Sequence, residues 1–90
     1  MEELRRFLER AKEDPRVGPV HISLFVVLLG MSEGKGIFRV RREEVMERAK
    51  IYGRTTYYKC MRELGRFGYI EYWRGGRRSG VRVLKEDTKG

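Results

Sequence analysis

The chain has 90 residues, with 21 Lys and Arg against 13 Asp and Glu, which gives a formal net charge of +8. A chain of this length predicts one domain, and its modest core buries about three-fifths of the unfolded surface. Its longest apolar run, residues 22–29, is far shorter than the roughly 20 residues of a membrane-spanning helix. The charged start of the chain also lacks the apolar stretch of a signal peptide. These features argue against a membrane protein and favour a cytoplasmic one.

The positive charge is concentrated in one part of the chain. Residues 1–16 carry five basic and five acidic side chains and are neutral. Residues 53–82 carry eight basic side chains, and Glu63 and Glu71 are the only acidic ones among them. A clustered basic surface attracts polyanions, of which nucleic acids are the most common in this compartment. The sequence therefore predicts a nucleic-acid partner.

An amphipathic helix is predicted at the start of the chain. Its apolar residues recur three and four positions apart, at Leu4, Phe7, Leu8 and Ala11. We expect the helix to run from Glu2 to Asp14 and to end at Pro15, because proline disfavours helix for the preceding residue. Its outer face mixes Glu and Arg, as a solvated surface does. The alternative is that residues 1–15 form an arm that pairs two copies of the chain into a homodimer.

A second helix and a short strand are predicted next. The helix begins at Pro19, a residue that suits the first helical turn, and it ends at Gly34 and Gly36. Its apolar residues face nearly all directions, so we expect it to be the most enclosed helix. His21, near its start, is expected to be solvated or to cap the helix. Residues 37–40 then alternate partly between apolar side chains and arginine, which predicts a short strand.

Two helices separated by a short turn follow the strand. The first is predicted at residues 42–50, the turn at 50–53 and the second at 54–67. The second has a clear apolar face, formed by Tyr57, Cys60, Met61 and Leu64. Gly68 can end it, because glycine adopts left-handed backbone angles without strain. This order is that of a helix-turn-helix.

A basic hairpin is predicted after the second of these helices. Residues 69–74 are rich in β-branched and aromatic side chains, residues 75–80 form a glycine-rich turn, and residues 81–84 form a partner strand. The segment at the tip, residues 74–80, would serve as a wing beside the helix-turn-helix. The winged-helix core is thus predicted at residues 19–85, and residues 86–90 are expected to be a frayed tail.

The candidate DNA-binding residues lie on the outer face of the second helix and on the hairpin. A helix can enter the major groove, where long donors reach base edges and arginine can bind guanine through two hydrogen bonds. We expect base-edge or nearby contacts from Arg54, Tyr58, Lys59 and Arg62. Phosphate contacts are expected from Thr55 and Thr56, and phosphate or minor-groove contacts from Arg74, Arg77 and Arg78. The alternative for all of these side chains is an ordinary solvated surface.

Other kinds of site find little support in the sequence. There is no nucleophile with a histidine base and no phosphate-binding glycine loop, so we do not expect an enzyme. Cys60 and His21, the single cysteine and the single histidine, provide too few ligands for a tetrahedral metal site, and we interpret Cys60 as a buried structural thiol. No cofactor and no small-molecule ligand are expected. Trp73 either stacks on a base or packs across the hairpin.

The segments GRTTYYKCMREL and GYI, at residues 53–64 and 68–70, resemble the winged-helix family of small prokaryotic DNA-binding regulators. The phrases HISLFVVLL and RTTYYKC resemble, more weakly, regulators carried by bacterial mobile elements. The resemblance covers about residues 22–84. It implies that Arg54, Thr55, Tyr58, Lys59 and Arg62 face DNA while Tyr57, Met61 and Leu64 hold the helix to the core.

The chain departs from this family in two places. The turn before Gly53 is one residue longer than usual, and Tyr57 is larger than the Val or Ile expected there, which implies a roomier pocket beneath the helix. The resulting expectation is an α+β fold, with a three-helix core, an added N-terminal helix and a small antiparallel sheet that carries the wing.

The expected function is sequence-specific binding of double-stranded DNA. The chain would be a nucleoid-associated transcriptional regulator or an accessory factor of a mobile element, and it would act by occupying its site. Two alternatives stay open, a protein-protein interaction module and an RNA-binding protein.

Overall fold

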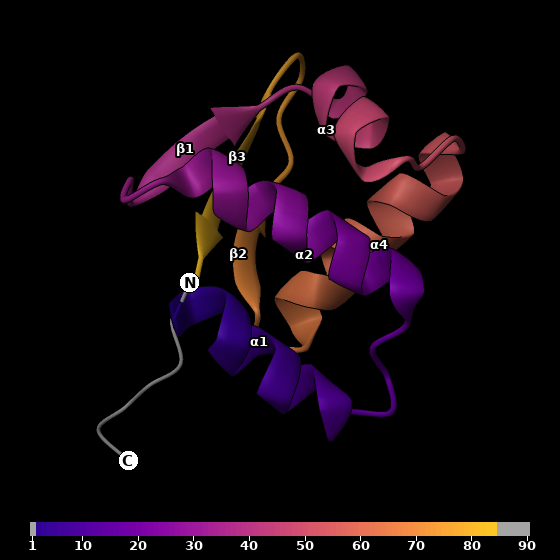
Figure 1. Ribbon diagram of the computed structural model, residues 1–90. Coiled ribbons are helices and arrows are strands. Elements are labelled where there is room, and N and C mark those ends of the chain that lie inside the picture. The colour runs from indigo at the N-terminus through magenta and orange to yellow at the C-terminus, as the bar shows by residue number, and fades with distance from the viewer. Residues whose placement is uncertain (1, 85–90) are drawn as a thin grey trace.

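The computed structural model describes residues 2–84, which form four helices and one three-stranded antiparallel sheet (Figure 1). The helices are α1 (Glu2–Lys12), α2 (Pro19–Ser32), α3 (Arg42–Ala49) and α4 (Arg54–Arg66). The strands are β1 (Ile37–Val40), β2 (Ile70–Trp73) and β3 (Ser79–Val83). The expected α+β class is confirmed, and the elements follow one another in the predicted order. The tail at residues 86–90 lies outside the described residues.

The sheet has the order β1-β3-β2, so the last strand lies in the middle. Val81 of β3 stands opposite Phe38 of β1 and Tyr72 of β2. Because side chains alternate along a strand, Phe38 and Val81 point into the core, whereas Arg82 points outward and is exposed. The strand β3 begins at Ser79, two residues earlier than predicted, because Ser79 and Gly80 pair with β1.

One hydrophobic core takes residues from every helix and every strand. Its members include Phe7, Leu24, Phe38, Val45, Met61, Ile70 and Val81. The helix α2 contributes Leu24 and Leu28, which are fully buried. The predicted apolar face of α4 is confirmed, since Tyr57, Cys60, Met61 and Leu64 are all buried. None of the helices in residues 2–84 has the length and apolarity needed to cross a membrane.

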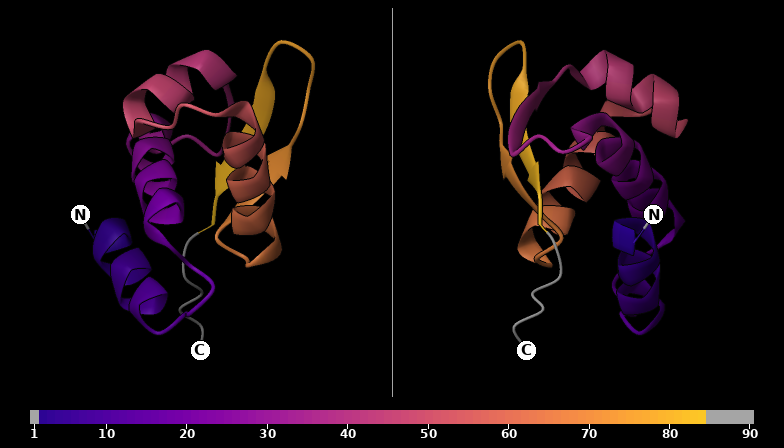
Figure 2. Two further views of the ribbon diagram at one scale, coloured as in Figure 1. Left: turned by 90° about the vertical axis from the view of Figure 1, so that its right-hand side faces the viewer. Right: turned by 60° about the vertical axis from the view of Figure 1, so that its left-hand side comes forward.

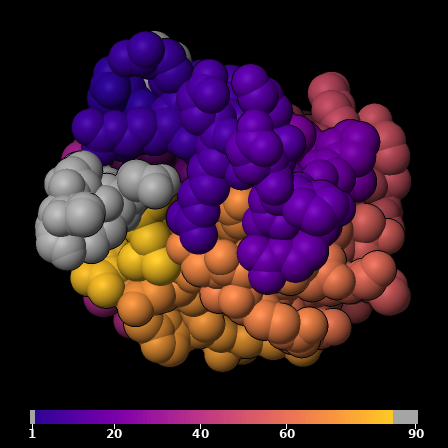
Figure 3. All heavy atoms as spheres, turned by 90° about the horizontal axis from the view of Figure 1, so that it is seen from below, coloured from indigo at the N-terminus to yellow at the C-terminus, as the bar shows by residue number. Residues whose placement is uncertain are grey.

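The helix α1 packs against α2 and against the end of α4. The ring of Phe7 stacks on Phe25 with the ring centroids 3.9 Å apart. The Arg10 guanidinium donates a hydrogen bond of 3.2 Å to the carbonyl oxygen of Phe67, just beyond α4. Seen from below, the segment after α1 lies directly beside the end of α4 (Figure 3), where Arg16 covers the Phe67 ring at 4.2 Å. These contacts fix α1 on the core of its own chain.

Three helices end one or two residues before the predicted positions. The helix α1 ends at Lys12 rather than Asp14, because the N–H groups of Glu13 and Asp14 donate to carbonyl oxygens three residues back and tighten the last turn. The helices α3 and α4 end at Ala49 and Arg66. Gly68 follows α4 with a φ of 91°, which confirms its predicted role in ending that helix.

Candidate nucleic-acid interface

The two faces of α4 separate core residues from polar residues. Arg54, Thr55, Thr56, Lys59 and Arg62 are all exposed. On the opposite face Tyr57 is only 1% exposed, and burial raises the pKa of its phenol. The space beneath the helix accommodates Tyr57, which is larger than the Val or Ile expected at this position. The outer face of α4 is therefore free to meet a partner while the inner face holds the helix in place.

The first turn of α4 offers backbone N–H groups to a ligand. The residue before the helix, Gly53, has extended backbone angles and no side chain that could cap it. The first hydrogen bond of the helix runs from the Tyr57 N–H to the Gly53 carbonyl oxygen. The N–H groups of the three residues before Tyr57 therefore have no partner within the helix. The exposed hydroxyls of the two threonines lie in the same turn. This arrangement suits an anionic oxygen, because a helix N-terminus carries partial positive charge.

Tyr58 connects α4 to α3 and to the hairpin. Its hydroxyl accepts a hydrogen bond of 3.4 Å from the Arg42 guanidinium, which lowers the pKa of the phenol. The Arg74 guanidinium covers its ring at 4.0 Å from the centroid. Its ring also meets the edge of Tyr57 at a centroid distance of 5.1 Å. Tyr58 is therefore half-buried and supports two arginines, which makes it a less direct candidate for base contact than Arg54, Lys59 or Arg62.

The loop between β2 and β3 carries the remaining predicted residues. Arg74, Arg77 and Arg78 are all exposed. The loop conformation depends on Gly75, because a Cβ at that position would overlap the carbonyl oxygen of Arg78. The loop lies at the same end of the molecule as α3 and the start of α4 (Figure 2). The contact of Arg74 with the Tyr58 ring shows that the start of this loop lies against α4.

A groove of about 710 Å³ separates this loop from α3. Its lining includes Arg41, Arg42, Tyr58 and Arg77, so guanidinium groups approach it from α3 and from the hairpin. Three carboxylates of α3, those of Glu43, Glu44 and Glu47, also line it. The groove therefore has mixed charge, and its positive part lies beside Tyr58.

The two acidic side chains within residues 53–82 form ion pairs with other partners. On the inner side of α4, Oε1 of Glu63 lies 2.8 Å from Nε2 of His21. On the sheet, Oε1 of Glu71 lies 2.7 Å from the Arg82 guanidinium. Within residues 2–84, no ion pair joins a carboxylate to the six cations Arg54, Lys59, Arg62, Arg74, Arg77 and Arg78. We refer to these six residues as the cationic face. None of its six charges forms an ion pair with a carboxylate of residues 2–84.

Trp73 lies at the base of the hairpin, opposite Gly80 in the strand register. Its ring approaches the position that a Gly80 Cβ would occupy to within 3.4 Å, while 48% of the residue is exposed. The tryptophan therefore packs across the hairpin, which is one of the two expected arrangements. Half of its surface is still available to a partner.

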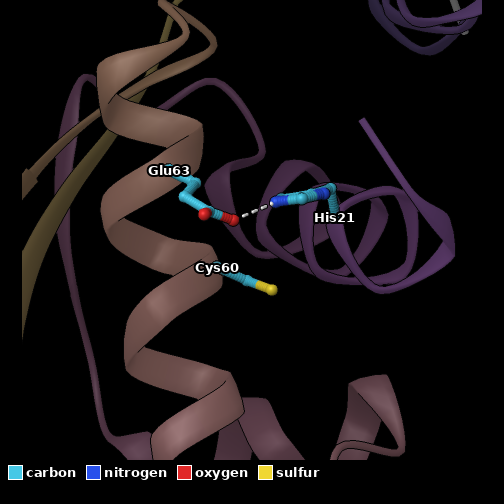
Figure 4. Close-up of side chains that lie close together, drawn as sticks. All are labelled: His21, Cys60 and Glu63. Carbon is cyan, nitrogen blue, oxygen red and sulfur yellow. Dashed lines mark hydrogen bonds and ion pairs between the residues drawn. The ribbon is translucent and has the colours of Figure 1, made fainter. Parts of the chain in front are cut away.

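A second cluster of polar side chains lies on the inner side of α4 (Figure 4). Gly18 donates its N–H to Nδ1 of His21 over 2.9 Å, so the expected capping role of the histidine is confirmed. Of the two expected arrangements the structure has capping rather than a solvated ring, since His21 is only 8% exposed and its Nε2 contacts Glu63. Cys60 is buried, as expected, and its thiol belongs to the same cluster.

The helix α1 lies away from the cationic face, at the opposite end of the molecule from α3 and the hairpin loop (Figures 1 and 2). Phe7 and Ala11 are buried against the core, and Leu8 is 43% exposed on the outer side. A homodimer through α1 would therefore use its outer side.

Sequence reasoning missed two contributors to these sites. Arg42 reaches Tyr58 from another helix, and Glu63 joins His21 across 42 positions of sequence. No local pattern marks either contact. Comparisons of the chain with protein-family models, with curated proteins and with solved structures find no match.

Proposed function

We propose that the protein is a winged-helix protein that binds double-stranded DNA in a sequence-specific manner. In this proposal α4 enters the major groove and the loop between β2 and β3 acts as the wing on the backbone or in the minor groove. The protein regulates transcription or assists a mobile element by occupying its site, without catalysis, in the cytoplasm at the nucleoid.

The observation that carries the proposal is the cationic face. Six exposed cations on α4 and the adjoining hairpin form no ion pair with a carboxylate among residues 2–84. Holding unpaired like charges close together is unfavourable in the absence of a polyanion, and a nucleic acid supplies one. The long donors on α4 suit base edges, whereas the first turn of α4 suits a phosphate.

Tyr58 supports the proposal by joining the two halves of the interface. Arg74 rests on its ring, and Arg42 donates to its hydroxyl. A duplex has to meet the helix and the wing at a fixed spacing, and contacts between the two elements keep that spacing. We assign Tyr58 to positioning and Arg54, Lys59 and Arg62 to contact with the bases or the nearby backbone.

The salt dependence of DNA binding tests the proposal. Each phosphate contact makes the slope of log affinity against log salt more negative by about 0.9. Six contacts from the cationic face would therefore give a slope as steep as about −5. The variant Arg54→Ala/Lys59→Ala/Arg62→Ala should make the slope less negative by up to about 2.7, as measured by fluorescence anisotropy with a labelled duplex.

The matched control is Arg5→Ala/Lys12→Ala/Lys35→Ala, which removes the same charge from exposed sites outside the cationic face. We expect this variant to bind duplex DNA almost as the unmodified protein does. Equal losses in both variants would mean attraction by net charge alone and would contradict the interface. Competition by duplex RNA as effective as by duplex DNA would favour the RNA alternative, because the A-form major groove does not admit the helix. Absence of DNA binding at low salt would favour the protein-docking alternative.

A further inference from the structure

Three side chains with metal-binding atoms meet between α2 and α4. They are the imidazole of His21, the thiol of Cys60 and the carboxylate of Glu63, and their ligand atoms all lie within 4.8 Å of one another. Figure 4 shows Cys60 and Glu63 extending from one side of α4 toward His21 on α2. His21 and Cys60 are buried at 8% and 6% exposure, whereas the Glu63 side chain keeps 23% exposure and borders solvent. The cluster is thus enclosed but reachable.

The separations match a small ion after a modest adjustment. A tetrahedral zinc ion binds nitrogen and oxygen at about 2.0 Å and sulfur at about 2.3 Å, which places its ligand atoms roughly 3.3–3.7 Å apart. His21 Nε2 and Glu63 Oε1 are 2.8 Å apart and would open slightly. The Cys60 sulfur would approach the other two atoms by at most about 1.3 Å.

The charges of the cluster also favour a divalent ion. A metal ion binds cysteine as the thiolate and glutamate as the carboxylate. One thiolate and one carboxylate then balance two positive charges in an enclosed site. Thiolate and imidazole ligands select transition metals over magnesium or calcium.

We propose that His21, Cys60 and Glu63 form a binding site for one divalent transition-metal ion, with zinc as the best fit. Three protein ligands leave the fourth position to water or to another small ligand on the side of Glu63. The site lies on the buried face of α4, so the ion joins α2 directly to α4. The proposal is independent of the DNA-binding function, because it uses only side chains on the inner side of the helix.

Proton movements accompany binding. Nδ1 of His21 accepts the Gly18 N–H, which assigns the ring proton to Nε2, where it points toward Glu63. A metal at Nε2 displaces that proton, and the neutral ring carries its proton on Nδ1 instead. The thiol of Cys60 loses one proton to solvent, so the net release is one proton per ion. The Gly18 N–H then loses its acceptor on His21.

Cobalt(II) is the probe for the test, because thiolate ligation gives it a charge-transfer absorption band in the near ultraviolet. Reduced protein without an affinity tag is titrated with cobalt chloride. We expect this band and four-coordinate visible bands to saturate at one equivalent and to disappear when zinc chloride is added. Absence of the charge-transfer band in the unmodified protein at excess cobalt would overturn the proposal, whatever the behaviour of any variant.

Variants identify the ligands. Cys60→Ser should abolish the charge-transfer band, and His21→Gln and Glu63→Gln should each weaken cobalt binding at least tenfold. The control Glu44→Gln removes a carboxylate that pairs with Arg48 on α3, and it should bind cobalt like the unmodified protein. Circular dichroism of each metal-free variant identifies those that fold. Unchanged binding by folded His21→Gln and Glu63→Gln would mean binding by the lone thiol and would also overturn the proposal.

Discussion

Two replacements of Tyr58 distinguish its contact with Arg74 from its contact with Arg42. Tyr58→Leu removes the ring that Arg74 covers at 4.0 Å and also the hydroxyl that Arg42 reaches at 3.4 Å. Tyr58→Phe keeps the ring and removes only the hydroxyl. If the ring positions the hairpin, the leucine variant should lose both stability and DNA affinity, whereas the phenylalanine variant should lose little of either.

The magnitudes follow from the two distances. A cation over an aromatic ring at a partly exposed site contributes about 0.5–1 kcal/mol, and this corresponds to about a two- to fivefold change in an equilibrium constant. The hydrogen bond from Arg42 is longer than the usual range of about 2.7–3.2 Å, so we expect it to contribute less than the ring contact. The ring contact should therefore dominate the difference between the two variants.

A double-mutant cycle measures the ring contact directly. Tyr58→Leu and Arg74→Ala are combined, and the free energy of unfolding of all four proteins is obtained from urea titrations. We expect the two changes to be coupled by about 0.5–1 kcal/mol. The same cycle built on Tyr58→Phe should show almost no coupling, because phenylalanine keeps the ring and Arg74→Ala then costs the same in both backgrounds. Additive effects in the leucine cycle, or equal damage from phenylalanine and leucine, would refute the assigned role of the ring.

Three further predictions concern the core, the hairpin and the acid sensitivity of the fold. Leu64→Ala should lower the free energy of unfolding by about 2–5 kcal/mol, because Leu64 is fully buried. Arg62→Ala should change it by less than about 0.5 kcal/mol, because Arg62 is exposed. Similar losses in urea titrations of the two variants would mean that the faces of α4 are misassigned. Gly75→Ala should destabilise the protein by about 1–3 kcal/mol in the same titration, because its Cβ would overlap the Arg78 carbonyl oxygen. Gly76→Ala, whose Cβ meets open space, should not, and equal effects would contradict the close approach at Gly75. The Arg16 guanidinium donates hydrogen bonds to Asp14 and holds the pKa of its carboxyl well below the ordinary value of 3.8. The stability that these hydrogen bonds give is complete above pH 3.8 and is lost as the pH falls below it. Asp14→Asn should therefore lose less stability than the unmodified protein when thermal melting is followed from neutral pH down to about pH 2, and parallel curves would contradict this role.

The order of the elements and the two faces of α4 could be predicted from the sequence because both are local properties. Spacings of three and four residues place Tyr57 and Leu64 on one side of a helix whatever the rest of the chain does. Gly68 ends the helix through its own backbone freedom, which also needs no distant partner. These predictions agree with the structure to within one or two residues at the helix ends.

The contacts that define the two sites could not be predicted in this way, because they join distant segments. Arg42 and Tyr58 belong to different helices, and their approach depends on the angle between α3 and α4. The helical period alone assigns Tyr58 to the outer face, yet its ring lies between two arginines. Likewise the sequence indicated only two candidate metal ligands, the single histidine and the single cysteine. Glu63 joins them only because the fold packs α2 against α4. The early start of β3 depends on pairing with β1, which is equally non-local.

Selection from a random pool of double-stranded DNA at near-physiological salt tests the central proposal most directly. The protein is immobilised, the retained duplexes are sequenced, and the same selection is performed with Arg54→Ala/Lys59→Ala/Arg62→Ala. We expect an enriched motif that the variant fails to enrich, and a palindromic motif would show a two-fold dimer and its half-site spacing. Retention without enrichment would contradict sequence-specific recognition, and absence of any retained DNA would contradict DNA binding itself.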